Sequence, residues 1–192
     1  KLVAAKRADR SATEGVVVSK IVGQKGYMLC LACETDFVAK NSEFSATANE
    51  ILDIAIAADA ADLEALNAVA ADGRTVADKV TEKSGQTGEK VELVYYAKIE
   101  APMCVTYIHT NHKLGTLIGF NKEIGMEVAK DVAMQAAAMA PISISREDCD
   151  PAVIEHERSI GREQARLDGK PEAMLDKIAE GKVNKFLTEN RR

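Results

Sequence analysis

The chain has 192 residues, of which 46% are hydrophobic and 29% charged, so it can bury a core and is not expected to be disordered. Its 25 Lys and Arg against 30 Asp and Glu give a net charge of −5, which excludes the global positive field that non-specific binding to nucleic acid requires. No apolar run reaches the about 18 residues that a membrane-spanning helix needs. We therefore expect neither a membrane nor a specific nucleic acid as a partner.

The first segment, residues 1–13, is typical of the end of a basic, exposed helix that links to a core. The chain opens inside this helix and without Met, so we expect the natural N-terminus to precede Lys1, and nothing in the segment indicates a signal peptide. Basic residues gather at both ends of the chain, in 1–10 and 182–192. An RNA- or ribosome-binding module that uses these ends is an alternative that stays open.

Residues 14–88 predict a first subdomain that begins with a β-hairpin. Two runs rich in β-forming residues, 16–21 and 27–34, flank a four-residue turn with Gly at both ends, Gly23–Gly26. This spacing is typical of two antiparallel strands joined by a tight turn.

Helical signals follow the hairpin. Asn41 or Ser42 can cap a helix whose apolar residues recur at steps of three and four and so share one face; these are Phe44, Ala48, Ile51, Ala55 and Ala58. A second helical stretch lies around 63–69. Thr75 with Asp78 three residues later resembles a capping box that opens a third helix.

Residues 89–148 predict a second, related subdomain. Apolar and polar residues alternate from 91 to 99, two further strands are expected at 103–110 and 114–120, and a helix follows that ends before Pro141. The order of elements predicts an α+β fold of two related subdomains, in which each small antiparallel sheet packs against its own helices.

Residues 149–188 predict an antiparallel helical hairpin, which a short tail, 189–192, follows. Asp150 can cap free amides and Pro151 suits the first helical position, while Gly169–Pro171 ends this helix and starts another of similar length. Apolar residues on both helices are mixed with many charges. We therefore expect a narrow, half-exposed hairpin that projects from the body as a docking element.

Cys30 and Cys33 form a C-x-x-C pair, which raises the alternative of a thiol or metal enzyme. The pair lies in a predicted strand, where residues three apart face opposite sides of the sheet, so the two sulfurs can neither pair nor share a metal. His109 and His112 flank a turn without an accompanying carboxylate cluster. No P-loop or G-x-S-x-G pattern appears either, so we expect no catalytic residue, no metal, no cofactor, and reduced thiols as in the cytoplasm.

The stretch from Cys33 to Asn41 connects the predicted hairpin to its helix and holds one large aromatic residue, Phe37. Thr35 and Asp36 are expected to end a strand, which places Phe37 in the connection. Its ring can plug the bottom of the core, which the local pattern alone favours, or it can be offered to another protein.

The run Glu34–Asn41 (ETDFVAKN), with Phe44 downstream, closely resembles the signature of the bacterial elongation factor Ts family. The resemblance extends through almost the whole chain. Further similar segments are the entry into the core (10–15), the start of the last strand of the second subdomain (114–115) and two parts of a protruding coiled-coil hairpin (168–171 and 180–186).

This resemblance implies a guanine nucleotide exchange factor for elongation factor Tu, not an enzyme that makes or breaks bonds. The loop of Thr35, Asp36, Phe37 and Val38 is implied to press into the GTPase domain, where Phe37 wedges between helices and shifts the groups that hold Mg²⁺ and the phosphates. Because factor and nucleotide favour different arrangements of one site, each weakens the affinity of the other. The chain itself is implied to bind no nucleotide.

A second contact, with another domain of elongation factor Tu, is also implied; its candidates are Leu114, Gly115, Met134, Gln135 and Met139. Some relatives carry His where Gln135 stands, and an amide can replace a hydrogen bond of that His but not a cation. The alternative for Met134 and Met139 is that both side chains fill core.

The resemblance carries three further expectations. The family's small N-terminal helical domain would precede Lys1, and relatives often continue past Arg192. The location is expected to be cytoplasmic. Elongation factor Tu is the expected protein partner, while a homodimer stays open.

Overall fold

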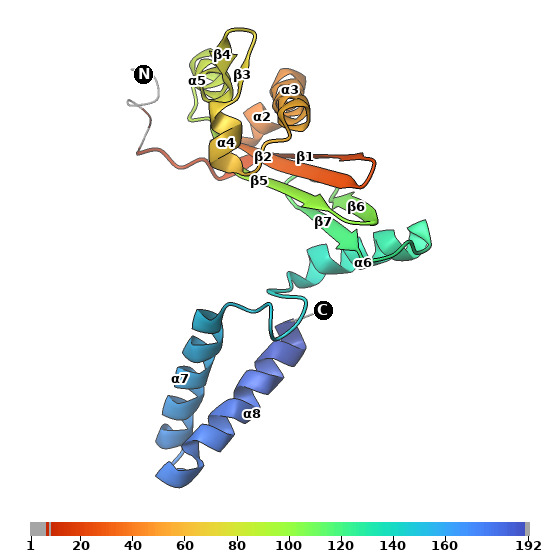
Figure 1. The fold of residues 1–192 in the computed structure, drawn as a ribbon. Coiled ribbons are helices and arrows are strands. Elements are labelled where there is room, and N and C mark those ends of the chain that lie inside the picture. The colour runs from red at the N-terminus through yellow and green to blue at the C-terminus, as the bar shows by residue number, and fades with distance from the viewer. Residues whose placement is uncertain (1–6, 8, 191–192) are drawn as a thin grey trace. The chain divides into compact units, whose positions relative to one another are not determined.

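The computed structural model describes residue 7 and residues 9–190, which form two compact units, 1–137 and 138–192 (Figure 1). Small antiparallel sheets and helices confirm the predicted α+β class. Most of the helix expected in 1–13 lies outside the described residues. Residues 9–13 form a turn, a bend and irregular chain, not a helix.

The first unit holds most of the strands and helices. In chain order they are β1 (Glu14–Val22), β2 (Lys25–Cys33), α2 (Asp36–Ala39), α3 (Ser42–Ala58), α4 (Leu63–Ala68), β3 (Ala70–Ala71), β4 (Arg74–Thr75), α5 (Val76–Thr87), β5 (Glu92–Glu100), β6 (Met103–Ile108), β7 (Gly115–Phe120) and α6 (Met126–Met139), whose last two residues lie beyond the boundary of the unit. The second unit contains α7 (Pro151–Leu167) and α8 (Glu172–Asn190).

The main sheet has the strand order β1-β2-β5. The predicted hairpin is confirmed: β1 and β2 pair from Glu14↔Cys33 to Val22↔Lys25. Its turn is tighter than expected, because β2 already begins at Lys25 and Gly23 reverses the chain with a φ of 60°.

The strand at residues 92–100 requires a correction. The sequence pattern placed it in the second subdomain, but β5 pairs with β2, with Lys25↔Glu100 at one end and Ala32↔Glu92 at the other. Alternation of apolar and polar residues identifies a strand without identifying its neighbour. The first sheet therefore does not end at residue 88. That the two halves of the core are related stays a prediction.

One face of the main sheet is covered by α3, α4 and α5 (Figure 1). The predicted face of α3 is confirmed for Phe44, Ala48, Ile51 and Ala55, which are at most 1% exposed. Ala58, which shares their spacing, is exposed because α3 ends there. The capping box of Thr75 and Asp78 is present at the start of α5.

The other face of the sheet is covered by the β6–β7 hairpin, and glycines allow this close approach. A Cβ at Gly115 would lie 2.9 Å from Val17 Cγ1, and one at Gly26 would lie 2.5 Å from Leu117 Cδ1. The hairpin packs its own far side on α6 through a small core that includes Val105 and Ala129. The first unit is thus layered as helices, sheet, hairpin and helix.

The predicted helical hairpin of the second unit is confirmed as α7 and α8. Asp150 caps α7 with Pro151 at its start, as expected. The seam uses small residues: Gly161 lies so close to Ala179 that a Cβ there would be 3.1 Å from the Cα of Ala179. The tail is predicted to begin at residue 189, but α8 continues to Asn190. That the hairpin projects from the body stays a prediction.

Asp59 connects the end of α3 to the main sheet. It adopts a φ of 47° and accepts hydrogen bonds from Lys25 Nζ (2.9 Å), the Tyr27 hydroxyl (2.9 Å) and Lys98 Nζ (3.2 Å). These hydrogen bonds, that of Lys25 first, hold the pKa of Asp59 well below its usual range.

The lowered pKa of Asp59 predicts how the stability of the fold depends on pH. Because the carboxyl ordinarily titrates near pH ~4, its contribution is fully present above that pH and is lost as the pH falls through the lower pKa of the folded state. Asp59→Asn, which tolerates the left-handed backbone, should lower the free energy of unfolding at pH 7. It should also flatten the loss of stability below pH ~4. Urea unfolding at several pH values measures this, with Asp53→Asn, which removes a single ion pair to Lys20, as control. A variant as acid-sensitive as the wild type would contradict it.

Candidate functional site: an exposed aromatic loop

The prediction that Thr35 and Asp36 end a strand is wrong: β2 ends at Cys33, and the connection to α3 is a one-turn helix, α2, which begins at Asp36 because the Thr35 side chain caps it. Thr35 caps this helix in an extended conformation, and the Val38 amide donates to its Oγ1 at 3.4 Å. Asn41 then caps α3, accepting the Glu43 amide at 2.8 Å. The backbone on both sides of Phe37 is therefore hydrogen-bonded.

Phe37 points into solvent with 84% of its surface exposed. The next two residues turn the other way: Val38 packs against the main core, and Ala39 is buried. The alternative in which Phe37 plugs the core, which the local pattern favours, is therefore wrong. A phenyl ring left in water forgoes about 1.5–3 kcal/mol of burial free energy, which a partner that covers the ring could recover.

An ion pair spans α2. Lys40 Nζ lies 2.6 Å from Asp36 Oδ2, one helical turn apart. The hydrogen bond from Lys40 lowers the pKa of Asp36, and the same bond raises the pKa of Lys40. Both side chains are exposed and both belong to α2 or its C-cap, so the pair adds little to the stability of the fold.

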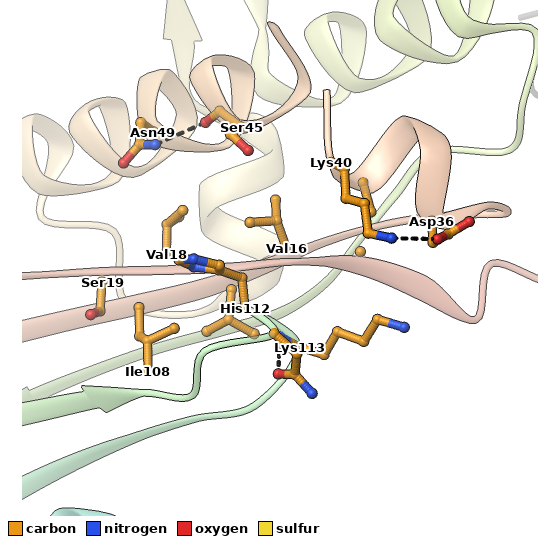
Figure 2. A pocket seen from close by; sticks show the side chains of 14 residues that line it. Val16, Val18, Ser19, Asp36, Lys40, Ser45, Asn49, Ile108, His112 and Lys113 are labelled. Atoms are coloured by element: carbon orange, nitrogen blue, oxygen red, sulfur yellow. Dashed lines mark hydrogen bonds and ion pairs between the residues drawn. The ribbon is translucent and has the colours of Figure 1, made fainter. Parts of the chain in front are cut away.

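A groove of about 520 Å³ lies beside α2, between β1, α3 and the turn that joins β6 to β7 (Figure 2). Its lining includes Asp36 and Lys40 from α2, Asn49 from α3, and His112 and Lys113 from the turn. The His112 carbonyl accepts the Val17 amide at 2.7 Å, which fixes the turn against β1. The groove thus adds polar and charged groups to the surface next to Phe37.

Of the residues predicted for the second contact, some are exposed and Gly115 is packed inside the unit. Leu114, Met134 and Met139 are 42–45% exposed, so the alternative in which the two methionines fill core is wrong. Gly115 instead packs on Val17 and Met28. The start of β7 reaches α6 through the Thr116 hydroxyl, which donates to the Ala133 carbonyl at 2.7 Å.

Two further exposed residues of this surface were not predicted from the sequence. Val128 and Val132 on α6 are 58% and 41% exposed. With Gln135 and Met139 they recur at steps of four, three and four, so the four share one face of the helix. We call them the α6 stripe. The alanines at 129, 133 and 137 are buried on another face, and this contrast of small and large apolar residues is the signal that could have found the stripe.

The C-x-x-C pair does not form a site. Cys33 is buried in the main core, whereas Cys30 is half-buried in the same strand, opposite Val17 and Tyr95. Both thiols are free, and burial raises the pKa of Cys33 to about 12 and also raises that of Cys30. Within residues 7 and 9–190, no three His, Cys, Asp or Glu side chains are grouped so that they could hold a metal ion.

These raised pKa values predict inert thiols. At pH 7.5 Cys30 and Cys33 should react with a thiol reagent at least about tenfold more slowly than a free cysteine, because the thiolate is the nucleophile. Unfolding in urea should make all four cysteines titrate rapidly. Mass mapping of the alkylated native chain measures the rates, and rapid labelling of Cys33 in the folded chain would contradict the assignment.

Comparison of the sequence with known proteins places the chain in a family. Residues 34–191 match the family model described as Elongation factor TS. The chain is 46% identical over 189 residues to the elongation factor Ts of Porphyromonas gingivalis, which covers 98% of this chain and 69% of the relative. The chain belongs to the elongation factor Ts family. It is accordingly a factor of translation elongation, and it acts in protein biosynthesis.

Other members of the elongation factor Ts family match over the same extent. The protein of Amoebophilus asiaticus is 44% identical over 193 residues, covering 98% of this chain and 70% of the relative. That of a Hydrogenobaculum species is 41% identical over 190 residues, covering 96% and 68%. In the part of the chain that the structure describes, no helix is both long and apolar enough to cross a bilayer.

Proposed function

We propose that this chain is a guanine nucleotide exchange factor that binds elongation factor Tu and accelerates the release of GDP. One observation carries the proposal: Phe37 is 84% exposed on a loop whose neighbours are anchored in the core. A ring held in this way can enter a partner without first being ordered, so little of its binding free energy is lost to conformational entropy. Membership of the elongation factor Ts family supports the same function.

The mechanism is a linkage between two ligands of one GTPase. The loop of Thr35, Asp36, Phe37 and Val38 presses its exposed side into the GTPase domain while the Val38 side chain stays against the main core, and the Phe37 ring displaces groups that hold Mg²⁺ and the phosphates of GDP. Mg²⁺ bridges protein and phosphate oxygens, so a shift of its ligands removes much of the nucleotide's affinity. The factor weakens GDP binding by the same factor by which GDP weakens binding of the factor. No bond is made or broken, and the chain itself needs no nucleotide or cofactor.

The α6 stripe and Leu114 provide a second contact, with a different domain of elongation factor Tu. Helix α6, which carries the stripe, lies on the far side of the main sheet and the β6–β7 hairpin from α2, whereas Leu114 directly precedes β7, next to the turn that borders the groove (Figure 1). Gln135 lies inside the stripe and supplies an uncharged hydrogen-bonding group. This contact adds affinity without touching the nucleotide site, so the two surfaces have separable kinetic effects.

The first test removes the ring. Phe37→Ala should reduce the maximal rate of GDP release from elongation factor Tu about 10- to 100-fold, which corresponds to about 1.4–2.7 kcal/mol of lost interaction in the exchange step. The thermal midpoint of the chain should not fall, because the ring contacts solvent in the free protein. Stopped-flow fluorescence of labelled GDP measures the rate over a range of factor concentrations.

Tyr95→Ala is the matched control, since Tyr95 is an aromatic residue that is 75% exposed but lies on β5. It should leave the maximal rate unchanged. Wild-type kinetics for Phe37→Ala would reject the role of the ring in exchange.

The second test separates the two surfaces. The double variant Val132→Ala, Met139→Ala should raise the factor concentration at half-maximal rate about five- to twentyfold, as expected for about 1–1.8 kcal/mol of lost apolar contact. The maximal rate should stay within twofold of the wild type. Val22→Ala, which truncates a 47% exposed residue of β1, is the control. A fall in the maximal rate at unchanged half-saturation would contradict the assignment of the α6 stripe to affinity.

A further inference from the structure

We propose that Glu89 is a positioning residue that holds residues 35–38, the Phe37 loop, in the geometry that binds the partner. This inference rests on the proposed exchange function. Glu89 lies between α5 and β5, more than 50 positions from the loop in sequence. No sequence pattern around Glu89 indicated a role for it. The structure places its carboxylate directly on the backbone that precedes α2.

The Glu89 carboxylate accepts three hydrogen bonds from the start of the loop. Its Oε2 accepts the amides of Glu34 at 3.0 Å and Thr35 at 3.1 Å, and its Oε1 accepts the Thr35 hydroxyl at 2.6 Å. A carboxylate that accepts from several donors forms stronger bonds than a neutral acceptor does. These contacts fix both the backbone and the side chain of Thr35.

Thr35 passes this constraint to the residues around Phe37. Its hydroxyl donates to Glu89 and at the same time accepts the Val38 amide, so one oxygen joins Glu89 to the first turn of α2. A helix of four residues has almost no stability of its own, because the cost of nucleation exceeds what one turn returns. The geometry of α2 must therefore come from contacts outside it, and Glu89 supplies the contact at its N-terminus.

Glu89 is itself held in place. Gly88 ends α5 with a φ of 76°, which turns the chain, and the Glu89 amide donates to Thr87 Oγ1 at 3.3 Å. Ser84, a buried polar residue, donates from its hydroxyl to the Glu89 carbonyl. The Arg7 guanidinium in turn donates to Ser84 Oγ at 3.1 Å.

A further hydrogen bond joins the same two segments, and in it Glu34 supplies the accepting carboxylate. The Glu34 carboxylate accepts the Lys90 amide, while the Glu34 amide donates to Glu89. Arg10 donates to the same Glu34 carboxylate at 3.2 Å. The end of β2 and the approach to β5 are thus joined by side chains from both sides, beyond the last paired residues of the sheet. This arrangement makes the loop a rigid extension of the sheet.

The test replaces the carboxylate with an amide of the same shape. Glu89→Gln retains one acceptor oxygen, so it cannot accept from the Thr35 hydroxyl and from both amides as the carboxylate does. The maximal rate of GDP release from elongation factor Tu should fall about five- to tenfold, because fewer molecules hold Phe37 in the competent position. The factor concentration at half-maximal rate should change less than twofold, since the α6 stripe is intact.

A second measurement does not depend on activity. Hydrogen exchange of the free chain should show the amides of Glu34 and Thr35 exchanging at least about tenfold faster in Glu89→Gln, with the core amides of β2 unchanged. Glu92→Gln, the same change three residues along the chain on an exposed residue, is the control and should match the wild type in both measurements. Phe37→Ala should slow GDP release without changing these amides.

A third variant shows whether the contacts act as one unit. Thr35→Val keeps the shape of the side chain but removes its hydroxyl, and it should slow release as much as Glu89→Gln. Combining the two should cause little further loss, because they break the same connection. If Glu89→Gln does not fold, hydrogen exchange of the free Thr35→Val chain decides the inference, because it does not depend on contacts with the partner; wild-type exchange of the amides at positions 35 and 38 in that variant overturns the inference.

The outcomes separate the inference from the function on which it rests. If Phe37→Ala slows release and Glu89→Gln does not, the positioning role is wrong and the exchange function stands. If neither variant slows release, the role of the Phe37 ring fails as well, and if the wild-type chain does not accelerate release, the exchange function itself fails. Unchanged amide exchange at Glu34 and Thr35 in Glu89→Gln also overturns the positioning role.

Discussion

The function proposed for this protein depends on one constraint: an aromatic ring must remain in water while the backbone on both sides of it is fixed. Val38 and Ala39 pack on the main core one and two residues after Phe37, and Phe44 is buried at the start of α3. The chain before the ring is held because the Thr35 amide and hydroxyl donate hydrogen bonds to the Glu89 carboxylate. The ring therefore cannot retreat into the fold without breaking these contacts, and the free energy of its burial remains available to a partner.

The layered first unit explains how the protein presents two binding surfaces. Glycines in β2 and β7 let the β6–β7 hairpin lie against the main sheet, and alanines let α6 lie against the hairpin. Since the small residues face inwards, the larger apolar side chains of α6 are left in solvent. One surface therefore carries a single ring on a short helix, and the other carries a broad apolar stripe. The single ring is suited to insertion into a partner, and the stripe is suited to binding along the partner's surface.

The sequence predicted what local pattern can encode. The β1–β2 hairpin, the buried face of α3, the capping box at Thr75 and the α7–α8 hairpin follow from periodicity and caps. Pairing of β5 with β2 could not be predicted in this way, because alternation is the same whichever strand lies beside it. The exposure of Phe37 was likewise beyond local pattern, which favoured burial. It depends on Glu89 and on core residues that are distant in sequence, and only the family resemblance indicated it.

The central claim is that this chain opens the nucleotide site of elongation factor Tu, and the dissociation rate of GDP tests it most directly. Labelled GDP bound to elongation factor Tu is mixed with excess unlabelled GDP, with or without increasing amounts of this chain. The account predicts that the rate rises with the concentration of the chain and reaches a plateau far above the spontaneous rate. A rate that stays at its spontaneous value at every concentration would contradict it.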